Sequence, residues 1–216
     1  SANVSNRGLG ESGNYNYELN GESTPISFDD VMYLNGIIEK SEYVSEVLFD
    51  TISNLVEDTS MSTLDFPELI TVKNDIDFFL ISQLPMTSNV DRLIEVYKNH
   101  EGLDFEEMNC VTHDLVLYDI PKGLDNKGLT DCLIKKFNSH PFIMAIKEQI
   151  KENGSLGYGR VVRWIQDNTT TVPTPRSWEL KKEQLVNTLY DWICYFDADY
   201  YWDTPTHSQV IFYQKY

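Results

Sequence analysis

One tripeptide of this 216-residue chain fits part of a metal-dependent nuclease motif. Glu179 and Lys181 have the spacing of the Glu-x-Lys half of a restriction-type site, in which a carboxylate holds Mg²⁺ and the lysine orients the attacking water. The upstream carboxylate would be Asp167, 12 residues before Glu179. The tripeptide falls where we expect a helix to begin, whereas this chemistry needs a strand. A metal-dependent nuclease is therefore kept only as a third alternative.

Cysteine and histidine side chains offer one set of zinc-capable ligands. Cys110 and His113 form a Cys-x2-His pair, and Cys132 and His140 follow later in the chain. Structural zinc sites usually take their ligands from two closely spaced pairs, one at each end of the site. The second pair is missing here, so we predict neither a metal site nor another cofactor. Three widely spaced cysteines also make no disulfide framework, which favours an intracellular location in the cytoplasm or nucleus.

The chain contains no motif typical of nucleophilic catalysis or nucleotide binding. It has no Gly-x-Ser-x-Gly elbow, and none of its four histidines has a recognisable triad partner. The glycine-rich stretch 154–159 lacks the lysine of a phosphate-binding loop, and we interpret it as a flexible connection between two helices. These observations favour a non-enzymatic protein.

The acidic residues are concentrated in the first two thirds of the chain. Residues 1–150 hold 26 of the 34 acidic residues and 10 of the 17 basic ones, whereas residues 151–216 hold 8 and 7. An acidic surface repels nucleic-acid phosphates and suits a partner with a basic surface. No stretch reaches the roughly 18 apolar residues of a membrane span, so we expect no membrane partner.

The first part of the chain is predicted to be a disordered tail followed by an acidic helical domain. Residues 1–24 are rich in Asn, Gly, Ser and Glu, and residues 25–125 form the expected domain. Its predicted helices begin near Ser27, which is placed to cap the first of them, and cover residues 41–57, 74–84 and 90–97. The β-branched and aromatic composition of residues 111–120 predicts a strand.

Residues 126–216 are predicted to form a second domain of short helices followed by a β-hairpin. A helix over 129–137 leads into helices starting at Pro141, at Tyr158 and at Ser177. Aromatic and β-branched segments at 200–202 and 209–214 then flank a turn at 204–207. The predicted fold class is therefore mostly helical α+β.

This order of three helices and a hairpin resembles the winged-helix superfamily of helix-turn-helix domains, and an N-terminal second copy is an alternative. The resemblance implies DNA recognition by the third helix or, in many members, protein contact. The residues it assigns to nucleic-acid contact are Arg160, Arg163, Arg176, Trp178, Lys181 and Lys182. Acidic residues in the expected wing, such as Asp199 and Asp203, weaken the DNA interpretation.

Exposed aromatic residues on the hairpin are the second candidate for a binding surface. We expect Trp192 and Phe196 to lie in the core, and Tyr201, Trp202 or Tyr213 to reach the surface and contact a partner. The leading hypothesis is a non-enzymatic interaction or regulatory module within a larger complex. The alternative is a sequence-specific DNA-binding protein.

Overall fold

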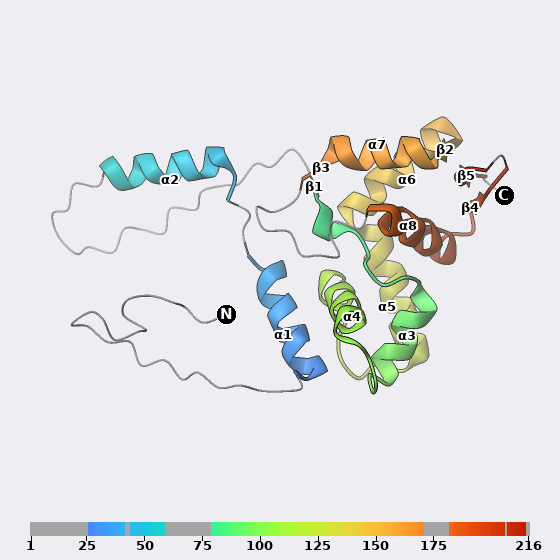
Figure 1. The fold of residues 1–216 in the computed structure, drawn as a ribbon, viewed down its shortest axis with the longest axis horizontal. Helices are drawn as coiled ribbons and strands as arrows, with labels where there is room; N and C mark the ends of the chain where they lie inside the picture. Colours follow the sequence, from blue (N-terminus) through green and yellow to red (C-terminus); the bar gives the residue numbers. More distant parts are fainter. Residues whose placement is uncertain (1–25, 42–43, 59–78, 171–181, 206, 215–216) are drawn as a thin grey trace.

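The structure, a computed structural model, describes residues 26–41, 44–58, 79–170, 182–205 and 207–214; within these ranges the side chains of 55–58, 182 and 183 are not described. Over these ranges the protein is a mostly helical α+β fold (Figure 1). The predicted tail at residues 1–24 lies outside the described residues. No described helix is long and apolar enough to cross a membrane.

The eight described α-helices are joined mostly by short connections. They are α1 (Phe28–Glu39), α2 (Glu46–Asp58), α3 (Val90–Lys98), α4 (Phe105–Leu117), α5 (Asn126–Ser139), α6 (Pro141–Asn153), α7 (Tyr158–Asn168) and α8 (Lys182–Phe196). A 3₁₀ turn, Ile81–Gln83, precedes α3. Local signals explain several ends: Ser27 and Asp30 form a capping box at α1, and Gly154 ends α6 with φ of 70°.

Five short strands make two sheets among the described residues. They are β1 (Phe79–Leu80), β2 (Ser155–Gly157), β3 (Thr169–Thr170), β4 (Tyr200–Asp203) and β5 (Val210–Tyr213). β1 and β3 pair in parallel, and the other three form an antiparallel sheet in the order β2-β5-β4. The predicted hairpin is confirmed, with Tyr201 opposite Phe212 and Asp203 opposite Val210.

One buried apolar cluster runs from Ile81 to Ile211 and takes side chains from α3 to α8 and from the hairpin. Trp192 lies at its centre as predicted, fully buried against Tyr118 and Phe137, and its Nε1 donates to the carbonyl of Thr87 at 2.9 Å. The cluster includes residues on both sides of position 125. The division into domains at that position stays a prediction.

Three predictions from the sequence are wrong in their local structure. Residues 111–117 belong to α4 and not to a strand, because Asp104 caps the helix and burial on nearly all sides hides a helical stripe. Residues 79–83 form β1 and a 3₁₀ turn instead of the end of a helix. The expected flexible connection contains β2, whose residues 155–157 pair with β5.

Candidate partner-binding surface

A buried hydrogen-bond network fixes α4 against the segment before α3. The carboxylate of Asp114 accepts from the backbone N–H groups of Met86 at 2.8 Å and Thr87 at 2.7 Å. The His113 ring lies 2.8 Å from Asp114 through Nδ1 and 2.7 Å from the carbonyl oxygen of Ser82 through Nε2. The ring therefore links Asp114 to the 3₁₀ turn that precedes α3.

The same region of α4 holds α1 in place. The amide of Asn35 donates to Thr112 Oγ1 at 2.8 Å, and this contact is buried. A carboxylate oxygen of Glu39 lies 3.7 Å from His113 Nε2, so a second acid from α1 faces the buried ring. Directed polar contacts set the orientation of α1, because apolar packing alone is non-directional. One face of α1 therefore rests on α4 and the other faces away.

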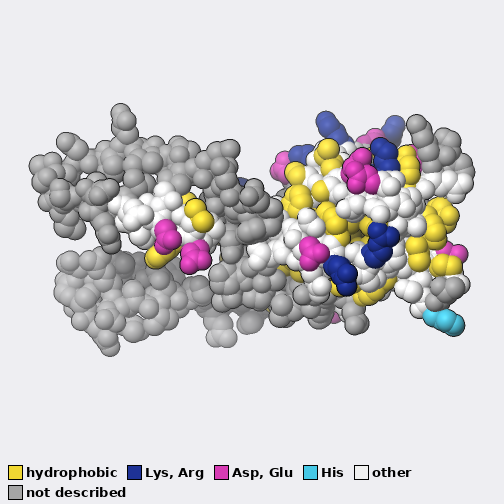
Figure 2. Space-filling model, turned by 90° about the horizontal axis from the view of Figure 1, so that it is seen from above, with side chains coloured by type: hydrophobic (Ala, Val, Ile, Leu, Met, Phe, Trp, Pro, Cys, Tyr) yellow, Lys and Arg dark blue, Asp and Glu magenta, His cyan; other side chains and the backbone are white. Residues whose placement is uncertain are grey.

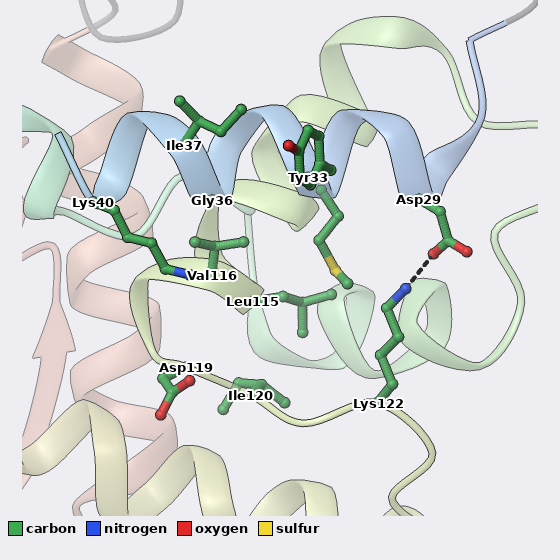
Figure 3. Close-up of a pocket in the computed structure, with 11 residues that line it drawn as sticks. Asp29, Tyr33, Gly36, Ile37, Lys40, Leu115, Val116, Asp119, Ile120 and Lys122 are labelled. Carbon is green, nitrogen blue, oxygen red and sulfur yellow. Dashed lines mark hydrogen bonds and ion pairs between the residues drawn. The ribbon is translucent and has the colours of Figure 1, made fainter.

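A groove of about 410 Å³ follows the line where α1 meets the end of α4. Leu115 and Ile120 line it on the side of α4 and the following loop, and Tyr33 and Ile37 line it on the α1 side (Figure 3). Met32 of α1 adds a third apolar side chain from that helix. A second hollow, of about 180 Å³, shares Met32, Leu115 and Ile120 and continues towards His100. The two hollows are neighbours beside α1, and hollows with apolar linings take apolar side chains of a partner.

Ion pairs lie at the rim of this groove. Lys122 Nζ is 2.6 Å from Asp29 Oδ1 and bridges the loop after α4 to the start of α1 (Figure 3). Lys136 Nζ is 2.9 Å from Asp119 Oδ2. Hydrogen bonds from these lysines lower the pKa of Asp29 and of Asp119, and the charge of Lys40 lowers that of Asp119 further. The rim therefore stays charged around an apolar lining.

Asp119 has a left-handed backbone, with φ of 48°, at the end of α4. The N–H groups of Asp119 and Ile120 donate to the carbonyls of Val116 and Leu115, which closes the helix as a Schellman motif. Glycine or asparagine usually fills this position, because a Cβ is strained there. The turn brings Ile120 back beneath α1 and so completes the lining of the groove.

Large apolar side chains are exposed on the outer surface of α1 and on the described part of α2. Nine of the fifteen large hydrophobic side chains exposed among the described residues lie between positions 26 and 52: Ile26, Tyr33, Leu34, Ile37, Ile38, Val44, Val47, Phe49 and Ile52. Tyr33 is 71% exposed and Val47 is 76% exposed. Exposed apolar side chains concentrated in this way mark a site of interaction.

Acidic residues accompany this apolar surface. Residues 26–58 hold eight Asp or Glu residues and one basic residue, Lys40. In the view from above, the described part of α2 shows hydrophobic and acidic side chains but no Lys or Arg (Figure 2). In Figure 1, α2 stands apart from the helices of the core. We call residues 26–41 and 44–58, which contain α1 and α2, the acidic arm.

The described part of the predicted apolar stripe of α2 lies apart from the core cluster. Val47 and Ile52 are exposed, Leu48 is buried, and none of the α2 side chains that the structure describes belongs to the buried cluster. The sequence does not single out the acidic arm as a site, because an apolar helical stripe normally indicates core packing. One signal in the sequence could have indicated this surface. The apolar residues of α1 surround the helix on several sides, and contact with α4 alone covers only one of them.

Two of the three predicted aromatic contact residues lie at the surface. Tyr201 is 43% exposed and stacks on Phe212, with ring centroids 4.9 Å apart. Trp202 is 38% exposed, and its Nε1 donates to Asp191 Oδ1 at 3.0 Å. Tyr213 is half-buried and packs against Tyr200. Their role in partner binding stays a prediction.

The predicted nucleic-acid residues are only partly described. Arg160 and Arg163 are exposed on α7, and Arg160 donates to Asn153 Oδ1 at 2.7 Å. Figure 2 shows Lys and Arg side chains over the α7 side of the body. Arg176, Trp178 and Lys181 lie outside the described residues, as does the side chain of Lys182. The described outward face of α8 carries Gln184, Asn187, Asp191 and Tyr195, which include no cation.

Within the described residues, no group of three or more His, Cys, Asp or Glu side chains is placed to hold a metal ion. Two of the four zinc-capable residues named in the sequence analysis have separate structural roles. His113 is hydrogen-bonded to Asp114, and His140 directly precedes the first turn of α6. Glu179 and Lys181 of the nuclease-like tripeptide fall outside the described residues.

The class of protein defined by this structure is a mostly helical α+β fold with an acidic, apolar surface beside a groove. Comparisons with protein-family models, curated proteins and solved structures each found no match.

Proposed function

We propose that this protein is a non-enzymatic interaction module that works within a larger complex. The observation that carries the proposal is the concentration of exposed apolar side chains on the acidic arm, beside the groove between α1 and α4. Burial of apolar area contributes about 25 cal/mol per Å², so leaving this surface in water costs free energy that a partner would recover. A partner is the simplest reason for such a surface.

The partner we propose is a basic amphipathic helix of another protein. Its apolar face would fill the groove over Leu115 and Ile120, in the manner of a helix lying in a groove. Its Lys and Arg side chains would face the acidic residues of the arm, which outnumber its basic residues by seven to one. Charge complementarity of this kind speeds association and excludes acidic competitors.

A labelled synthetic helix with a leucine face and lysine flanks, about 18 residues long, is the probe for this proposal. Fluorescence anisotropy with the full chain should show saturable binding that weakens as salt is raised, because exposed charges are screened. A scrambled peptide of the same composition is the control. Equal binding of both peptides, or no binding of the amphipathic one, would overturn the proposal.

A second candidate, DNA binding by a winged helix at residues 141–213, is favoured by topology. The element order α6-β2-α7-α8-β4-β5 and the sheet order β2-β5-β4 support a winged-helix arrangement, in which the short first strand joins the hairpin. The exposed guanidinium of Arg163 and the net charge of +3 over residues 160–182 would contact phosphates.

The acidic wing and the cation-free outward face of α8, as far as it is described, favour protein contact over DNA. A mixed-sequence duplex titrated at low and physiological salt separates the two candidates. DNA binding requires an affinity that falls steeply with salt and weakens in Arg163→Ala, Lys181→Ala and Lys182→Ala. Absence of binding at low salt would remove this candidate and leave the acidic arm unaffected.

A further inference from the structure

A separate exposed patch combines two aromatic rings with two carboxylates on α3, α8 and β4. The hydroxyl of Tyr195 donates to Asp91 Oδ1 at 3.1 Å, and Trp202 Nε1 donates to Asp191 Oδ1 at 3.0 Å. Both rings are more than a third exposed. We call these four residues, Asp91, Asp191, Tyr195 and Trp202, the Tyr195–Trp202 patch. None of them lies on the acidic arm or its groove.

The fold turns these side chains outward. The other faces of α8 are buried, with Leu189, Trp192 and Ile193 fully enclosed, so residues 184, 187, 191 and 195 make its outer stripe. Asp191 and Tyr195 are one helical turn apart and therefore neighbours on that stripe. β4 pairs with β5 alone among the described strands, and this edge position places Trp202 beside α8.

The patch is negatively charged and has no cation of its own. Neither Asp91 nor Asp191 forms a salt bridge with any Lys or Arg in the part of the chain that the structure describes. Arg92, next to Asp91, is directed to Glu95 and Glu107 instead. Burial, together with the hydrogen bond to Asp91, raises the pKa of Tyr195, as expected of a phenol in a negative field.

Each carboxylate also retains acceptor capacity. The aromatic side chains of the patch bond to Oδ1 of Asp91 and to Oδ1 of Asp191, and a carboxylate accepts several bonds through its two oxygens. An aromatic face attracts a cation by its quadrupole, with Trp the strongest, and a neighbouring carboxylate adds a charged hydrogen bond. Guanidinium satisfies both requirements, because it is planar and presents a fork of N–H donors.

We propose that the Tyr195–Trp202 patch binds the guanidinium of an arginine in an extended basic segment of a partner protein. The guanidinium stacks on the Trp202 ring and donates to Asp191, while Tyr195 and Asp91 hold the next basic side chain. The patch shares no residue with the groove beside α1. An experiment can therefore disprove the proposal for one of these surfaces and leave the proposal for the other intact.

The test is an anisotropy titration of the full chain with a labelled peptide of alternating arginine and glycine, about 10 residues long. Asp191→Asn keeps an oxygen acceptor for Trp202 but removes the charge, and Trp202→Leu removes the ring. Each should weaken binding about three- to tenfold, as expected for one exposed cation–π contact or charge-assisted bond. Ile37→Glu on the acidic arm should leave the affinity unchanged.

General attraction to an acidic protein is the competing explanation, and a matched control separates it. Glu152→Gln removes one charge from an exposed position on α6 and should change binding less than about twofold. A lysine version of the peptide should bind more weakly, since ammonium does not stack as guanidinium does. Equal losses for Asp191→Asn and Glu152→Gln, or equal affinity for the two peptides, would overturn the proposal.

Discussion

His113 and Asp114, adjacent on α4, are hydrogen-bonded to each other through Nδ1 and Oδ1 at 2.8 Å, and both are fully buried. The pair connects three segments. Asp114 holds the backbone of Met86 and Thr87, and His113 reaches the carbonyl of Ser82. Glu39 of α1 lies near the same ring. The orientation of α1, and with it the shape of the groove, depends on this network.

Asp114→Asn should therefore destabilise the fold strongly. The amide keeps one acceptor oxygen but turns an N–H₂ group towards the existing donors, so the buried N–H of Met86 or of Thr87 loses its acceptor. A buried donor left without its acceptor costs about 1–3 kcal/mol, and more where the lost acceptor is charged. The free energy of unfolding from urea titration measures this. Asp119→Asn, at an exposed carboxylate, is the control and should change stability by less than about 1 kcal/mol.

Thr112→Val tests the contact between α1 and α4. Valine has nearly the same shape but removes the acceptor for the Asn35 amide, and a buried donor that loses its acceptor costs about 1–3 kcal/mol. Thr130→Val on α5 is a matched control, because its hydroxyl bonds to the Asn126 carbonyl within its own helix. Equal unfolding free energies for the two variants would contradict the role assigned to Thr112.

Stability should fall as the pH is lowered from about 6.5 to about 4, in part because of His140. Burial lowers the pKa of His140 from 6.5 to about 4. Between these values the unfolded chain binds a proton that the folded chain does not, so the unfolded state gains stability as pH falls. The contribution is at most about 3.5 kcal/mol, since one unit of pKa corresponds to about 1.4 kcal/mol.

His140→Phe isolates this contribution. Phenylalanine keeps the edge contact with the Tyr118 ring and cannot titrate. The difference in unfolding free energy between about pH 7 and about pH 4.5 should be smaller in the variant than in the parent chain. An unchanged difference would mean that His140 does not titrate as its buried position predicts.

Cys194 should react slowly with thiol reagents in the folded protein. Burial raises its pKa to about 12, with a further increase from the nearby charges of Asp191 and Asp197. The thiolate is the reactive form and is scarce at neutral pH when the pKa is high. Mass spectrometry of iodoacetamide-treated protein should find Cys194 labelled much more slowly than in urea. Equal rates in the two conditions would contradict this.

The helices at the C-terminal end could be predicted because their signals are local. Pro141 at the first turn and Gly154 at the end define α6 in the sequence, and both act in the structure as expected. The apolar stripe through Leu189 and Ile193 likewise indicates the buried face of α8. Caps and periodicity depend on residues within a few positions, so they can be recognised without the rest of the fold.

The α4 segment and the acidic arm could not be predicted in this way. The buried polar residues Thr112, His113 and Asp114 break any apolar helical stripe, and their partners lie 27 to 77 positions away in the chain. The groove exists only because α1 packs across α4, which periodicity does not specify. Exposed apolar faces on α1 and α2 look like core faces in sequence, and only the fold distinguishes them.

The central claim is that the acidic arm binds a basic amphipathic partner, and one comparison tests it most directly. Ile37→Glu places a charge on the groove wall at a side chain that is 49% exposed, and Met144→Glu makes the same change on α6 at one that is 57% exposed. Both should fold, because exposed substitutions usually change stability by less than about 0.5 kcal/mol.

Affinity for the amphipathic peptide should fall at least about tenfold in Ile37→Glu, which corresponds to roughly 1.4 kcal/mol. It should stay within about twofold of the parent chain in Met144→Glu, because that side chain lies on α6, away from the groove. Equal affinities in the two variants would show that the peptide does not use the groove beside α1, and would contradict the proposed role of the acidic arm.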